Sequence, residues 1–71
     1  IYPNPIRNGM LNIYGFEKEV SVQIRGVSGQ LYWKGVTNST IDVSRLKNGL
    51  YFVSINDEGT IKTGKFIIAN N

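Results

Sequence analysis

The chain has 71 residues, 41% of them hydrophobic, and contains no cysteine and no histidine. This length allows one domain, and the composition excludes a disulfide framework and the usual histidine or thiolate metal sites, while no apolar run approaches the ~20 residues of a membrane span. The net charge is +3, but the eight basic residues stand singly along the chain, which is more typical of solubilising charge than of a clustered nucleic-acid-binding face.

The first nine residues predict a stiff corner rather than a strand. Pro3 and Pro5 fix the backbone, and Asn4 is held extended by the proline that follows it. The pair Asn8-Gly9 then predicts a turn into the first strand.

Strict two-residue alternation of apolar and polar side chains dominates the rest of the chain, and it predicts half-buried strands. The first covers residues 10–14, with Leu11 and Ile13 inward. The second covers 20–25 and is the most regular. The third covers 30–36, and alternation places Leu31 and Trp33 together on its core side.

Three further strands are predicted in the second half. They cover residues 40–43, 51–56 and 62–69, and residues 42–49 between the first two could form one helical turn. Gly29, Gly49 and the segment 56–59 supply turn residues that tolerate positive φ. Turn signals recur about every ten residues, so the predicted fold is all-β, a small immunoglobulin-like antiparallel β-sandwich of six to seven strands.

The aromatic residues admit two interpretations. Trp33, Tyr14, Tyr32 and Tyr51 could form a stacking platform for sugars or single-stranded nucleic acid. The favoured interpretation is that Trp33, the only tryptophan, is the central plug of the core, because so short a chain has few large side chains to fill one.

The residues that could carry catalysis are few. Without histidine or cysteine, paired carboxylates are the only standard option, and the pairs Glu17–Glu19 and Asp57–Glu58 both lie at predicted turns. Exposed carboxylates at turns are best explained as solvated polar residues. We therefore expect no enzymatic activity, no cofactor and no metal ion.

Five stretches taken in order resemble one family. They are "YPNP" at 2–5, "LNIYG" at 11–15, "VSVQIRGVSGQLYW" at 20–33, "IDVSRLKNGLYFVSI" at 41–55 and "GKFII" at 64–68. Together they are similar to the C-terminal sorting domain (type A) of the type IX, or Por, secretion system of Bacteroidota. The resemblance covers essentially the whole chain.

The resemblance implies a non-catalytic address label on a longer exported protein. Such domains are small β-sandwiches that follow a covalently linked N-terminal cargo domain. The cargo passes through the periplasm, the outer-membrane translocon recognises the sorting domain, and a surface sortase normally removes it. The implied final location is extracellular or on the cell surface, with no nucleic-acid partner.

By position, the resemblance assigns motif residues across the chain. They are Tyr2, Pro3, Asn4 and Pro5 as the opening motif, Gly29 and Gln30 as the middle turn, Gly49, Leu50 and Tyr51 at a strand start, and Lys65, Phe66, Ile67 and Ile68 in the terminal strand. Each of them could either contact the translocon or stabilise the fold. An open terminal strand would offer unpaired backbone groups to a partner, with Lys65 as a charged contact or as a guard against aggregation.

Two rival functions are a carbohydrate-binding module, based on Trp33 and the tyrosines, and a purely structural β-sandwich spacer. The chain is expected to be a single domain over residues 1–71, part of a longer protein. Open sheet edges in so small a domain would also allow a strand-exchanged homodimer.

Overall fold

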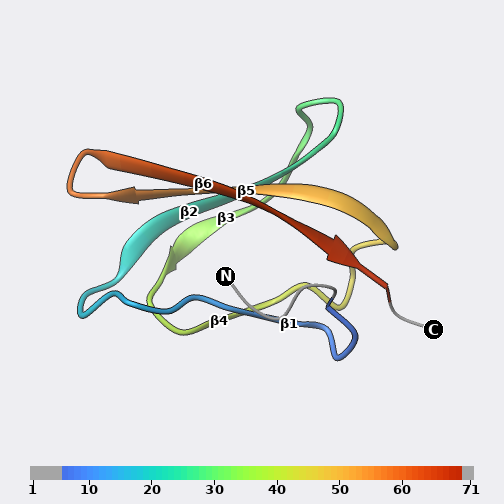
Figure 1. Cartoon of the computed structure of the whole chain (residues 1–71), viewed down its shortest axis with the longest axis horizontal. Helices are drawn as coiled ribbons and strands as arrows, with labels where there is room; N and C mark the ends of the chain where they lie inside the picture. The colour runs from blue at the N-terminus through green and yellow to red at the C-terminus, as the bar shows by residue number, and fades with distance from the viewer. Residues whose placement is uncertain (1–5, 70–71) are drawn as a thin grey trace.

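The computed structural model describes residues 6–69 (Figure 1). Its strands are β1 (Met10–Asn12), β2 (Val20–Gly26), β3 (Leu31–Thr37), β4 (Thr40–Asp42), β5 (Gly49–Asp57) and β6 (Thr60–Ile68). Among these residues there is no helix of the length and apolarity that a membrane crossing requires.

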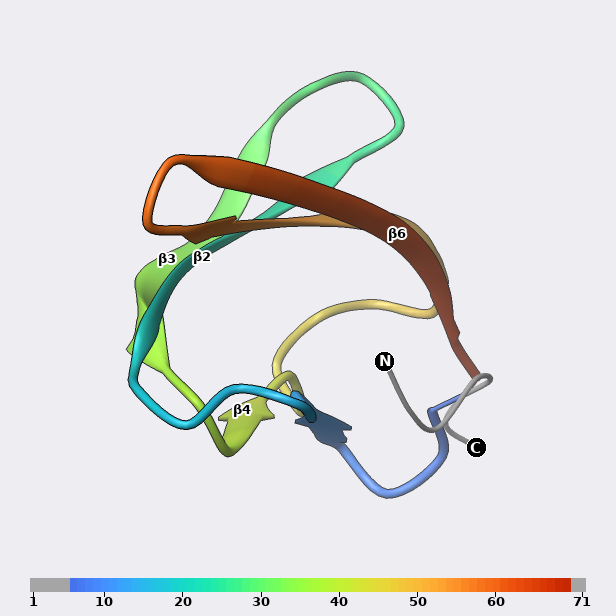
Figure 2. The same ribbon diagram turned by 60° about the vertical axis from the view of Figure 1, so that its left-hand side comes forward.

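The strands form two layers. The larger sheet has the order β3-β2-β5-β6 and the smaller one pairs β1 with β4, and every pair of neighbouring strands is antiparallel. Figure 2 shows the larger sheet arching over the smaller one, so that each covers an apolar face of the other. The prediction of an all-β antiparallel sandwich of six to seven strands is confirmed.

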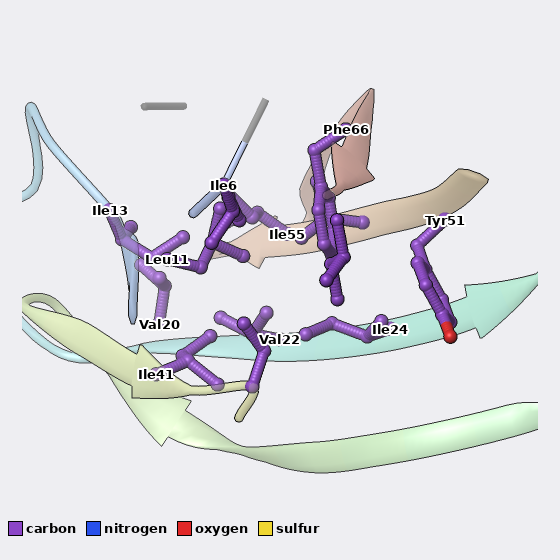
Figure 3. Packing of buried hydrophobic residues seen from close by; sticks show 13 residues of the cluster. Ile6, Leu11, Ile13, Val20, Val22, Ile24, Ile41, Tyr51, Ile55 and Phe66 are labelled. Carbon is purple, nitrogen blue, oxygen red and sulfur yellow. The ribbon is translucent and has the colours of Figure 1, made fainter. Parts of the chain in front are cut away.

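The core lies between the two layers and is built from the alternating positions that the sequence indicates. Side chains from both sheets meet there in one cluster (Figure 3). The buried hydrophobic residues are Ile6, Leu11, Ile13, Val20, Val22, Ile24, Ile41, Val43, Tyr51, Val53, Ile55, Phe66 and Ile68. Phe66 has the largest of the fully buried side chains, so the terminal strand β6 takes part in the core.

Trp33 is not the central plug, so this prediction was wrong. It is only partly buried and packs against the edge of the core, with its indole ring over Gly35 on β3. Leu31, predicted to share the core face with Trp33, is instead 42% exposed.

An irregularity in strand pairing explains the exposure of Leu31, whereas Trp33 is only partly buried because β3 is an edge strand of the larger sheet. The register of β2 and β3 shifts between Ile24, which pairs with Trp33, and Arg25, which pairs with Leu31. Tyr32 is therefore an extra residue in β3, as in a β-bulge, and strict alternation fails there. Tyr32 lies over Gly26 and meets Tyr51 edge-on, with the ring centroids 5.4 Å apart.

The turn predictions hold, with one exception. Gly9, Gly29, Gly49 and Gly59 all have positive φ, as predicted for turn glycines. Residues 42–49 do not form a helical turn, however. The backbone makes one tight turn in which Leu46 N donates to Val43 O at 3.0 Å, and the Asp42 side chain accepts a hydrogen bond from Ser44 N at 2.9 Å. This local side-chain bond competes with helix formation.

Candidate recognition surface

Strand β6 lies at one edge of the larger sheet, and its register determines which backbone groups face outward. Asp57 pairs with Thr60 across the two-residue turn, and the ladder continues without a break to Gly49 and Ile68. In such a hairpin the hydrogen-bonded pairs alternate with pairs whose backbone groups point away. By this alternation the N–H and C=O groups of Ile61, Thr63 and Lys65 point away from β5.

The two ends of the described chain meet at the last residues of β6. Ile6 N donates to Ile67 O at 2.7 Å, and Ala69 N donates to Ile6 O at 2.9 Å, in a parallel bridge between Ile6 and Ile68. Ile6 therefore covers the C-terminal part of the edge. Within residues 6–69, no strand pairs with the outer edge over residues 61–65.

The motif residues of β5 and β6 divide between the two faces of the sheet. Tyr51, Phe66 and Ile68 are buried, and Tyr51 stacks on Phe66 with 5.7 Å between the ring centroids. Leu50 pairs with Ile67 on the opposite, outer face, where their side chains are 39% and 46% exposed. The buried residues thus have a packing role, and the side chains of Leu50 and Ile67 contribute to the surface of the sheet.

The Gly29–Gln30 motif forms the turn between β2 and β3. Gly29 has φ +86° and its N–H donates to Gly26 O at 3.0 Å, while Gln30 O accepts from Gly26 N at 3.0 Å. Tyr32 Oη lies 3.4 Å from the Gln30 side-chain oxygen, to which it donates. The turn conformation alone accounts for a glycine here.

The opening motif, Tyr2, Pro3, Asn4 and Pro5, lies outside the described residues. The corner that follows it is well defined. Asn8 Oδ1 accepts a hydrogen bond from Met10 N at 3.1 Å, and Gly9 O accepts one from Val43 N at 2.8 Å. Asn8 and Gly9 therefore turn the chain into β1, as predicted.

A cleft of about 300 Å³ opens between β3 and the turn after β4. Its lining includes Tyr32, Trp33, Asp42, Arg45 and Leu46. Hydrogen bonds from the hydroxyl and the backbone N–H of Ser44 hold the pKa of Asp42 below its ordinary value, against a small opposing effect of desolvation. An aromatic wall beside a carboxylate and a guanidinium is a suitable arrangement for a polar ligand with an apolar face.

The other four acidic residues lie elsewhere. Glu17, Glu19, Asp57 and Glu58 surround an open hollow between the 15–19 loop and the turn from β5 to β6. Over the part of the chain that the structure describes, no group of three or more possible ligands is arranged to hold a metal ion. In Tyr51, burial is the main cause that raises the phenol pKa, with nearby Tyr32 adding to it, and Tyr51 Oη donates to Lys47 O at 2.7 Å.

Sequence reasoning missed Phe52 as a candidate surface residue. Phe52 is 42% exposed on the outer face of β5, directly between Arg25 of β2 and Lys65 of β6. The alternation of β5 does place its side chain on the face of the sheet opposite to that of Tyr51 and Val53. Its basic neighbours come from distant parts of the chain, so only the strand order brings them together.

A small antiparallel β-sandwich with an open terminal strand, and with its motif residues split between core and surface, is a domain suited to recognition through its surface. Compared with protein-family models, the chain matches the secretion system C-terminal sorting domain over residues 1–69. It therefore belongs to the C-terminal sorting domains of the type IX secretion system, as its resemblance predicted. A comparison with curated proteins finds no match.

Membership of this family has direct functional consequences. It indicates a sorting signal that is attached to an N-terminal cargo and interacts with the secretion machinery. The implied route leads through the type IX system to the cell surface or the extracellular space.

Proposed function

We propose that this chain, over all of its residues 1–71, is a non-catalytic C-terminal signal domain of a longer exported protein. It directs its cargo from the periplasm across the outer membrane by docking, in the folded state, on the type IX translocon. A surface sortase then removes it. The observation that carries the proposal is the family match over residues 1–69.

The open edge of β6 supports recognition of the terminal strand. Ile61, Thr63 and Lys65 direct backbone donors and acceptors outward, and a partner strand could pair with them by adding to the sheet. In this proposal Lys65 adds a charged contact. Tyr51, Phe66 and Ile68 contribute by keeping β6 in place.

The test is an export assay with a matched pair of proline variants. The domain is fused to a periplasmic reporter in a bacterium with a working type IX system, and reporter in the medium and on the cell surface is measured. Thr63→Pro removes an N–H that points outward, which an edge strand tolerates. Gly64→Pro removes an N–H that bonds to β5 and so disrupts the fold.

We expect Thr63→Pro to remain folded, with a urea midpoint close to that of the unmodified domain, and to lose most export. Gly64→Pro should lose both folding and export. Normal export of a folded Thr63→Pro variant would refute recognition through the edge. Failure of the unmodified fusion to leave the periplasm would refute the sorting function itself.

A second candidate, carbohydrate binding, is favoured by the cleft that Tyr32, Trp33, Asp42 and Arg45 line. Trp33 is the only tryptophan, so a glycan that stacks in the cleft should change the intrinsic fluorescence. A titration against a glycan panel with no change in emission would exclude this function. The structural-spacer alternative predicts that removing the domain destabilises the cargo without affecting export.

The open edges of β3 and β6 also support the prediction of a strand-exchanged homodimer. Size-exclusion chromatography with light scattering tests this directly. A single species of 8.0 kDa at all concentrations would exclude the dimer.

A further inference from the structure

The outer face of the larger sheet carries charge of one sign. Its strand positions include Arg25, Lys34 and Lys65, each of which pairs across the sheet with a neutral residue. None of the five acidic side chains lies at an outward-facing strand position of this sheet. No ion pair involving these three cations occurs within residues 6–69, so their charge is available to a partner.

An apolar cluster lies between two of these cations. Phe52 stands directly between Arg25 and Lys65 in one row of cross-strand neighbours. Leu50 and Ile67 form the next outward-facing pair along β5 and β6. These five residues, Arg25, Leu50, Phe52, Lys65 and Ile67, are called the Phe52 patch below.

Arg25 is held in place before any partner arrives. Its Nη1 donates to Gly29 O at 2.9 Å and its Nη2 donates to Gln23 Oε1 at 3.1 Å. A guanidinium has five N–H donors in a rigid plane, so further donors stay available for a carboxylate. This also gives the Gly29–Gln30 turn a second role, because its carbonyl orients a surface cation.

We propose that the Phe52 patch is the surface through which the domain docks on an acidic protein segment of the secretion machinery. The partner would place an apolar side chain against Phe52, Leu50 and Ile67, and carboxylates against Arg25 and Lys65. This inference rests on the proposed sorting function and extends the recognised region from the edge of β6 onto the adjoining face. Aromatic and arginine residues dominate binding energy at protein interfaces.

The small number of basic residues and the apolar centre of the patch favour a protein partner over an anionic membrane. Attachment to an anionic membrane typically takes clusters of roughly four to eight basic residues, whereas this face has three and centres on apolar side chains.

The experiment compares three variants in the reporter fusion. Phe52→Ser removes the centre of the patch, and Lys65→Glu reverses a charge beside it. Lys34→Glu is the matched control, because it makes the same charge change on the same face but on β3, two strands away from Phe52. Urea unfolding of each purified domain confirms that it is folded.

We expect Phe52→Ser and Lys65→Glu each to lower export at least about tenfold, and Lys34→Glu to stay within about twofold of the unmodified fusion. Normal export of folded Phe52→Ser and Lys65→Glu would overturn the patch while leaving the sorting function intact. Equal losses of export for Lys65→Glu and Lys34→Glu, together with binding of the unmodified domain to phosphatidylglycerol vesicles, would overturn the proposed protein partner in favour of a membrane. No export of the unmodified fusion would instead indicate failure of the underlying sorting proposal.

Discussion

Replacing Phe66 by alanine tests whether the terminal strand is part of the core. Phe66 is 0% exposed and stacks on Tyr51. Phe→Ala changes in cores cost about 3–5 kcal/mol, and a stacked aromatic pair adds about 0.5–1.5 kcal/mol beyond burial. We therefore expect Phe66→Ala to lower the free energy of unfolding by about 4–5 kcal/mol, near the upper end of the range for core substitutions. A domain of this length has a total stability of only about 4–11 kcal/mol.

The matched control is Ile67→Ala, on the same strand but on the outer face. Ile67 is 46% exposed, so we expect Ile67→Ala to lower the free energy of unfolding by only about 1 kcal/mol. Both losses are measured by urea unfolding at equilibrium, with Trp33 as the fluorescent reporter, and Phe66→Ala should also lower the melting temperature by roughly 20 °C or more. Equal destabilisation by the two substitutions would refute the assignment of Phe66 to the core and Ile67 to the surface.

Three further predictions concern turns, packing and pH. Glu58 is the one non-glycine residue with positive φ among residues 6–69, at +52°. Because asparagine tolerates this conformation better, Glu58→Asn should raise the free energy of unfolding by about 0.5–1 kcal/mol in urea titrations. A lower free energy of unfolding would contradict this. A Cβ at Gly35 would lie 2.7 Å from Cη2 of Trp33, so Gly35→Ala should cost about 1–3 kcal/mol and shift the tryptophan emission, and an unchanged spectrum would place the ring elsewhere. The pKa of Asp42 in the folded state lies below the ordinary value of an aspartate, so the stability that this carboxylate contributes is present above about pH 4 and is lost as the pH falls through the folded pKa. The unfolding free energy of the unmodified domain should therefore fall relative to that of Asp42→Asn below that pH, and parallel pH profiles would refute the assignment.

The sequence was a good guide to local structure wherever alternation was regular. In β2 and β5 the inward residues follow directly from the two-residue period, because side chains of an extended chain alternate between faces. It failed at β3, where the bulge beside Arg25 places Leu31 outside and the edge position of the strand leaves Trp33 only partly buried. A bulge depends on how two strands pair, and alternation within one strand does not record it.

The candidate site shows the same division. The family motifs, read in order, were sufficient to indicate a sorting domain, and positive φ at Gly29 and Gly49 was foreseeable from turn chemistry. The sequence alone does not indicate which motif residues face outward. The pairing of β5 with β6 decides it, since it buries Phe66 and Ile68 and leaves Lys65 and Ile67 exposed.

Residue order, short-range periodicity and backbone preferences were enough to predict the fold class, the glycine turns and the family. Only the tertiary structure decided that β6 is an edge strand and that Ile6 covers its last residues. It also gathered Arg25, Phe52 and Lys65 into one row, although 40 positions separate the two cations in the chain. The physical reason is that strand order and register arise from the burial of one shared core, and no single strand contains that information.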